Sequence, residues 1–161
     1  MQDRALTFSK NVFLPLTTVC RNRCGYCCFR TPARAGCLMA PAEVERTLKN
    51  GSALGCTEAL FTFGERPEEE PGFSPLIRAA GYPDILGYCE AMCRKSIEYG
   101  VLPHTNAGIL SPEEMERLRP VNASMGLMLE TTARVPAHRD SRGKEPEVRL
   151  AMIEDAGKMK I

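Results

Sequence analysis

The sequence predicts an α/β fold in which four consecutive strand-then-helix units form half of a parallel β/α barrel. The main observation is that short apolar runs alternate with amphipathic or well-capped helical segments along the whole chain. Such alternation is typical of parallel strands joined by right-handed helical crossovers. The second observation is length, because a closed barrel needs about 200–250 residues and this chain has 161. Four units therefore account for the chain, which ends where a fifth strand is expected.

The first unit and the second strand are predicted from apolar pattern. Residues 11–17 form a short apolar run and are predicted to be the first strand, although Pro15 is unusual inside a strand. Residues 41–54 carry spaced apolar side chains among charged ones, which indicates an amphipathic helix. Residues 58–63 are predicted to be the second strand. A loop rich in Pro and Glu is expected over residues 65–75.

The later units are marked by helix-capping residues. Gly100 stands where a C-terminal cap glycine belongs, and Ser111-Pro-Glu-Glu114 has the Ser, Pro and Glu of a helix start with a capping box. These signals frame the remaining elements. The predicted helices are 85–99, one starting at 111, and 147–156, and the predicted strands are 101–106 and 121–129.

Composition is that of an ordinary globular protein. The chain is 43% hydrophobic and 25% charged, with 21 basic and 20 acidic residues and a net charge of +1. We therefore expect neither nucleic acid nor a membrane as partner. The N-terminus has no apolar stretch after its basic residue, so we expect no secretory signal and a cytoplasmic location. Eight cysteines at partly short spacing favour metal or redox chemistry over disulfides.

The strongest chemical signal is a C-x3-C-x2-C group directly after the first predicted strand, formed by Cys20, Cys24 and Cys27. Thiolates are the usual ligands of iron–sulfur clusters, and three of them leave one iron of a [4Fe–4S] cluster without a protein ligand. Positive charge from the arginines in this loop favours the deprotonated thiols. We therefore predict that these three residues hold the cluster. Cys28 is an alternative to Cys27, although the spacing favours Cys27.

Two other interpretations of the cysteines stay open. Cys24 and Cys27 could combine with Cys89 and Cys93 in a non-catalytic zinc module, since zinc favours four ligands in two short pairs. Cys89 and Cys93 are also four residues apart on a predicted helix, as two core-facing side chains would be, and we favour that packing role. The same packing role is predicted for Cys37 and Cys56.

Several polar residues are expected at one edge of the sheet. Chemistry in parallel β/α barrels collects at the C-terminal ends of the strands. The cysteine group follows the first strand, Gly64-Glu65 ends the second, His104 to Asn106 end the third, and Glu130 ends the fourth. We interpret His104 as packed or hydrogen-bonded rather than as an acid or base. The run of residues 68–70 is predicted to be a solvated acidic loop, and the methionines at 125, 128, 152 and 159 are predicted to be core.

The cysteine group, with Tyr26 before its last member, resembles the radical S-adenosylmethionine superfamily, whose core is a TIM-like barrel. The wider segments 7–27, 61–68, 102–106, 121–131 and 138–144 are similar to the deazaflavin synthases of coenzyme F-420 biosynthesis. Two positions depart from that pattern: Cys28 stands where Thr is expected, and Arg142 where Pro is expected. The resemblance covers nearly the whole chain, but the family's barrel continues past Ile161. We therefore expect residues 1–161 to be the N-terminal part of the domain and to be inactive without a second half.

The resemblance also implies cofactors and contacts. A [4Fe–4S] cluster and S-adenosyl-L-methionine are the implied cofactors. Gly64 and Glu65 match the motif that binds the methionine amino group, Glu130 would face the ribose hydroxyls, Tyr26 would contact adenine, and Ser124 would assist from the fourth strand. For each of these residues an ordinary structural role is the alternative.

The implied reaction is a radical lyase step that closes a deazaflavin ring. It starts from a hydroxybenzyl-ribitylaminouracil intermediate and releases ammonia, methionine and 5′-deoxyadenosine. The implied partners are this small-molecule substrate, a low-potential electron donor, and a partner synthase subunit or a missing C-terminal half. The partner synthase that builds the intermediate, or a biotin-synthase-like enzyme, is an alternative within the superfamily.

Overall fold

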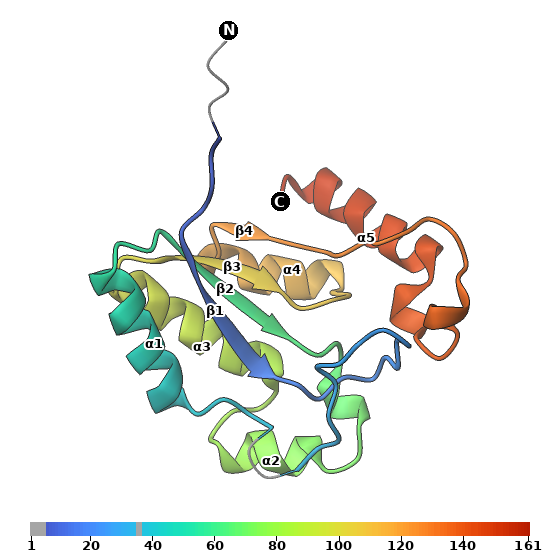
Figure 1. The fold of residues 1–161 in the computed structure, drawn as a ribbon, viewed down its shortest axis with the longest axis horizontal. Helices are drawn as coiled ribbons and strands as arrows, with labels where there is room; N and C mark the ends of the chain where they lie inside the picture. Colours follow the sequence, from blue (N-terminus) through green and yellow to red (C-terminus); the bar gives the residue numbers. More distant parts are fainter. Residues whose placement is uncertain (1–5, 35–36) are drawn as a thin grey trace, which may run out of the picture.

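The computed structural model describes residues 6–34 and 37–161. Its four strands form one parallel sheet in the order β1-β2-β3-β4, so each strand pairs with the next one along the chain. This is the order found in a β/α barrel, and the predicted half-barrel is confirmed (Figure 1). The strands are β1 (Asn11–Thr17), β2 (Glu58–Phe63), β3 (Leu102–Asn106) and β4 (Ser124–Met125).

The strand β1 tolerates its proline because of its position. Pro15 lacks a backbone N–H, which is acceptable at the edge of a sheet or beside a bulge. In the described chain β1 is an edge strand, and its register with β2 shifts between Pro15 and Thr17. The predicted strand therefore runs through the proline to Thr17.

Two of the helices pack directly on the sheet, and the others pack on neighbouring helices or turns. They are α1 (Pro41–Ala53), α2 (Phe73–Ala79), α3 (Ile85–Glu98), α4 (Pro112–Leu118) and α5 (Pro146–Met159). Helices α1 and α3 contact the strands and each other, and α5 contacts α4. The predicted caps are confirmed: Ser111 and Glu114 form a complete capping box, and Gly100 follows the end of α3 with a φ of 71°.

The strand side chains alternate between the helices and the open face of the sheet. Leu14, Leu16 and Phe61 point toward the helices and are fully buried, as the period of two in a strand requires. Their neighbours Phe13 and His104 lie on the other face and remain partly exposed. The open face is the side that would face the interior of a complete barrel. Within the described part of the chain, no helix is both long and apolar enough to cross a membrane.

Three predicted elements differ from the structure. The fourth strand was predicted over residues 121–129 but is only two residues long. Val121 lies in a 3₁₀ turn before it, and residues 126–129 after it are not part of a strand. Helix α2 was not predicted, since it lies in a segment rich in Pro and Gly. Helix α5 continues through Gly157, where we predicted its end, and stops at Lys160 in a left-handed conformation.

Four short 3₁₀ turns complete the described part of the chain. They are η1 (Pro67–Glu69), η2 (Arg119–Val121), η3 (Pro136–His138) and η4 (Arg142–Lys144). Turns η3 and η4 belong to the connection from β4 to α5. This connection returns to the same edge as the loop after β1 (Figure 1).

Candidate functional site

The three predicted cluster cysteines line one cavity at the C-terminal edge of the sheet. The cavity measures about 410 Å³, and Cys20, Cys24 and Cys27 contribute to its wall. Gly64 and Glu65 from the end of β2 and Asn106 from the end of β3 lie on the same wall. The structure thus brings together the groups that were expected at the ends of the first three strands. Apolar side chains from the open face, including Phe13 and Met128, close the rest of the cavity.

The donor set of this loop fits an iron–sulfur cluster. All three thiols are free, Cys20 and Cys24 are partly buried, and Cys27 is exposed. Burial raises the pKa of the Cys20 thiol, while the backbone N–H of Glu65 donates to its sulfur at 3.2 Å. A hydrogen bond to sulfur is a typical way in which a protein tunes a cluster ligand. Three thiols on one loop at a cavity wall are suitable ligands for a cluster with one open iron.

A zinc module built from two cysteine pairs does not fit. Cys89 and Cys93 are buried beneath the sheet, where both sulfurs lie within 3.6 Å of the Thr105 hydroxyl. Cys24 and Cys27 lie at the edge cavity instead. In residues 6–34 and 37–161, no three Cys, His, Asp or Glu side chains converge closely enough to hold a single metal ion, and this includes Cys20, Cys24 and Cys27. The predicted packing role of Cys89 and Cys93 is confirmed.

Gly64 is required by the close approach of the cysteine loop. A Cβ atom at this position would lie 1.9 Å from the carbonyl oxygen of Val19 and 2.6 Å from the Cβ of Cys20. No side chain fits at that distance from a backbone oxygen. Glycine therefore lets the end of β2 lie directly against Cys20.

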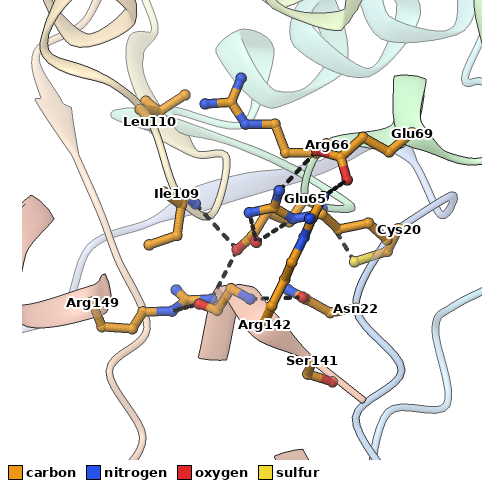
Figure 2. Close-up of polar contacts among 12 residues, drawn as sticks. Cys20, Asn22, Glu65, Arg66, Glu69, Ile109, Leu110, Ser141, Arg142 and Arg149 are labelled. Carbon is orange, nitrogen blue, oxygen red and sulfur yellow. Dashed lines mark hydrogen bonds and ion pairs between the residues drawn. The ribbon is translucent and has the colours of Figure 1, made fainter. Parts of the chain in front are cut away.

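Glu65 is a buried carboxylate whose oxygens are fully used by protein donors. It is 3% exposed. The Arg21 guanidinium donates to Oε1 at 2.9 and 3.0 Å, and Oε2 accepts from Arg149 at 3.0 Å and from the backbone N–H of Ile109 at 3.2 Å (Figure 2). Two guanidinium groups and a backbone N–H compensate this buried carboxylate for the hydrogen bonds to water that it loses. Contact of Glu65 with the cofactor amino group stays a prediction.

Two glycines make room for this carboxylate. A Cβ at Gly143 would lie 1.6 Å from Glu65 Oε1, and a Cβ at Gly108 would lie 2.6 Å from Oε2. Gly108 also has a φ of 73°, which favours glycine. Glu65 is thus enclosed by segments that follow β1, β2, β3 and β4.

The other predicted cofactor contacts are placed as follows. Tyr26 lines the cavity, is 56% exposed, and has its hydroxyl 3.0 Å from Nε2 of His138. Ser124 lies beside His104, with its hydroxyl 2.7 Å from the ring Nδ1. Glu130 has a left-handed backbone and pairs with Lys144, which lines the cavity. The roles of Tyr26, Ser124 and Glu130 toward the cofactor stay predictions.

Two predictions about surface and core residues were wrong. The acidic run 68–70 is not a solvated loop: Glu68 accepts from the first backbone N–H of α3, Glu69 pairs with Arg21 and Arg142, and Glu70 with Arg30. These arginines lie in the segment after β1 and in the β4–α5 connection. Ion pairs with them hold the acidic residues 69 and 70 against these segments. Met128 was expected in the core but is 56% exposed on the cavity wall.

The sequence did not indicate a role for Arg149, or for His138 and Ser141, which precede it. Arg149 is 2% exposed on α5, and a buried arginine requires an acceptor. Its position in a helix full of charges gave no signal of this burial. His138 and Ser141 are also buried and lie against the cysteine loop.

Comparison with known proteins agrees with this geometry. The model of the Radical SAM superfamily matches residues 14–161. The chain is 70% identical to a 7,8-didemethyl-8-hydroxy-5-deazariboflavin synthase from Methanoregula boonei and 66% identical to one from Methanoculleus marisnigri. Each match covers 100% of this chain and 49% of the relative, so the chain spans about half the length of these curated relatives. The crystal structure of methylornithine synthase (PylB) is similar with a TM-score of 0.66 at 17% identity, over 92% of this chain and 41% of that one.

The fold and the site define half of a β/α-barrel protein that places a three-cysteine loop at the C-terminal edge of its sheet. The match over residues 14–161 then identifies the family. The chain belongs to the radical SAM superfamily. Membership implies a [4Fe–4S] cluster and S-adenosylmethionine as cofactors.

Proposed function

We propose that the chain is the cluster-binding half of a radical SAM enzyme of deazaflavin biosynthesis. In the proposed reaction a hydroxybenzyl-ribitylaminouracil intermediate cyclises to 7,8-didemethyl-8-hydroxy-5-deazariboflavin with loss of ammonia and of two hydrogens, a lyase reaction. S-adenosylmethionine accepts the two electrons and is converted to methionine and 5′-deoxyadenosine. The names of the relatives from Methanoregula and Methanoculleus support the deazaflavin product. Because the chain spans half of them, we propose that a second half completes the barrel and that a low-potential donor supplies electrons. We also propose that residues 1–161 form the N-terminal part of one domain.

The chain's own residues would bind and orient the cofactors. When bound, the cluster would supply the electron for reductive cleavage of S-adenosylmethionine. Cys20, Cys24 and Cys27 are the residues that would hold the cluster, and the Glu65 N–H stabilises negative charge on the Cys20 sulfur. The cavity beside them is mostly apolar, with polar groups such as Asn106 at its wall. Such a wall excludes water from a reactive intermediate.

The observation that carries the proposal is that the three cysteines and Gly64 all line one cavity of about 410 Å³. The test is anaerobic reconstitution of the chain with iron and sulfide, followed by iron and sulfide analysis and visible absorption. We expect close to four irons per chain, and strong loss in Cys20→Ser, Cys24→Ser and Cys27→Ser. Cys28→Ser is the matched control, since Cys28 is the adjacent exposed thiol. A chain that takes up no iron, or loses it equally in the control, contradicts the proposal.

The reaction itself requires a completed barrel. The chain should be joined to, or expressed with, the C-terminal half of the relative from Methanoregula boonei. Production of the deazaflavin, together with methionine and 5′-deoxyadenosine in equal amounts, would support the proposed reaction. Cleavage of S-adenosylmethionine without deazaflavin would indicate another reaction of the superfamily.

A further inference from the structure

The cysteine loop is held from outside by a segment that comes more than a hundred residues later. We call residues 136–149 the bracing segment; it contains η3, η4 and the start of α5. Four of its members bind the loop directly, and one of them is His138, whose ring Nε2 lies 3.0 Å from the Tyr26 hydroxyl. The backbone N–H of Gly25 donates to the Ala137 carbonyl at 2.8 Å, and the N–H of Arg23 donates to the Ser141 hydroxyl at 2.9 Å. Asn22 accepts from the Gly143 N–H at 3.2 Å.

Arg149 fixes this segment to the end of β2. Its Nε donates to the Gly143 carbonyl at 2.6 Å, and its Nη2 donates to Glu65 at 3.0 Å (Figure 2). Glu65 in turn binds the guanidinium of Arg21, and the Glu65 carbonyl accepts from the Arg21 N–H at 2.9 Å. The chain of contacts therefore runs from α5 through Glu65 to the residue that follows Cys20.

We propose that Arg149 is a positioning residue for the cluster-binding loop, acting through Glu65 and the bracing segment rather than by contact with the cysteines. The loop between Cys20 and Cys27 has no regular secondary structure of its own. Its backbone N–H groups at 21, 23 and 25 are all bound to residues outside it. Arg149 contacts Glu65, which accepts the Arg21 N–H, and Gly143, which donates to Asn22, so it orders the thiols before iron binds. This lowers the entropy lost on cluster binding.

The first measurement is hydrogen exchange of the chain without iron. In Arg149→Met, the amides of Arg21, Arg23 and Gly25 are expected to exchange faster, while those in the centre of β2 stay protected. Arg149→Lys keeps the charge but loses the fork geometry, so partial loss of protection is expected. Arg139→Met is the matched control, because Arg139 lies in the same segment, is exposed, and forms no ion pair in the described part of the chain.

The second measurement is iron affinity. Loss of a residue that orients metal ligands reduces affinity by about tenfold or more, and we expect this in Arg149→Met and not in Arg139→Met. Ser141→Ala provides a milder test if Arg149→Met does not fold, since it removes only the acceptor of the Arg23 N–H. Unchanged exchange at the three amides overturns the proposal. Faster exchange over the whole chain in both Arg149→Met and Ser141→Ala also overturns it, because the role would then be general stability.

This inference rests on the proposed cluster site, and the two fail differently. If the unmodified chain binds no iron, the cluster proposal fails. The exchange measurement needs no iron and still reports whether Arg149 orders the loop.

Discussion

Gly143→Ala tests whether the Glu65 carboxylate is fixed in place. The added Cβ would lie 1.6 Å from Oε1 and 2.5 Å from Cδ of Glu65. A free side chain would move aside at little cost, but this carboxylate is 3% exposed and is held by Arg21, Arg149 and the Ile109 N–H. Overpacking costs about 1–3 kcal/mol and breaking a buried ion pair about 3–5 kcal/mol. We therefore expect the free energy of unfolding to fall by about 3 kcal/mol.

The assay is thermal and urea unfolding followed by far-ultraviolet circular dichroism, since the chain has no tryptophan. For a domain of this size each kcal/mol shifts Tm by about 2–4 °C, so a decrease of roughly 6–12 °C is expected. Gly157→Ala is the matched control on α5. In the part of the chain that the structure describes, no atom outside the local helix backbone lies within 4 Å of a Cβ at Gly157. Alanine in a helix is favoured by roughly 0.5–1 kcal/mol over glycine. That variant should be slightly stabilised.

The two glycine variants should move stability in opposite directions. If the Tm of Gly143→Ala equals the Tm of Gly157→Ala, the Glu65 carboxylate is free to move. The ion pairs with Arg21 and Arg149 would then not fix the carboxylate, and Arg149 would not hold the end of β2 against the bracing segment.

Three further predictions use other parts of the chain. Ser111→Ala removes one half of the capping box with Glu114 and should lower the free energy of unfolding by about 1 kcal/mol, measured by urea denaturation. The hydrogen bond from Arg94 lowers the pKa of Glu90 in the folded chain. The ionised Glu90 carboxylate therefore stabilises the fold at neutral pH. This stabilisation decreases as the pH falls below the ordinary glutamate pKa of about 4 and is lost below the lowered pKa of the folded chain. Because this pair is near the surface, Glu90→Gln should cost less than about 1 kcal/mol at pH 7 and nothing at low pH, in unfolding measured at both. Gly64→Ala should abolish iron binding in the reconstitution assay, and unchanged iron content would show that the Cys20 backbone adapts.

The sequence alone determined the order of the parallel strands, the helices around them and the place of the cysteine loop. These features depend on local patterns: the apolar runs of β1 and β2, the capping box at Ser111 and the cap glycine at position 100. Neighbouring βα units also pack in chain order, so the sheet topology follows from the element order. The end of β2 at Gly64 then brings Gly64 and Glu65 to the cysteines without further information.

Only the tertiary structure decided what surrounds those residues. Glu65 and Arg149 are 84 residues apart, and Arg23 and Ser141 are 118 apart. No local pattern distinguishes a buried Arg149 from a solvated one, because both occur among charged residues in a helix. Burial arises when the β4–α5 connection folds back over the loop after β1, where a buried carboxylate without guanidinium partners would be costly. The same folding makes Gly143 necessary and draws Glu69 into ion pairs, since these positions acquire their neighbours only in the assembled fold.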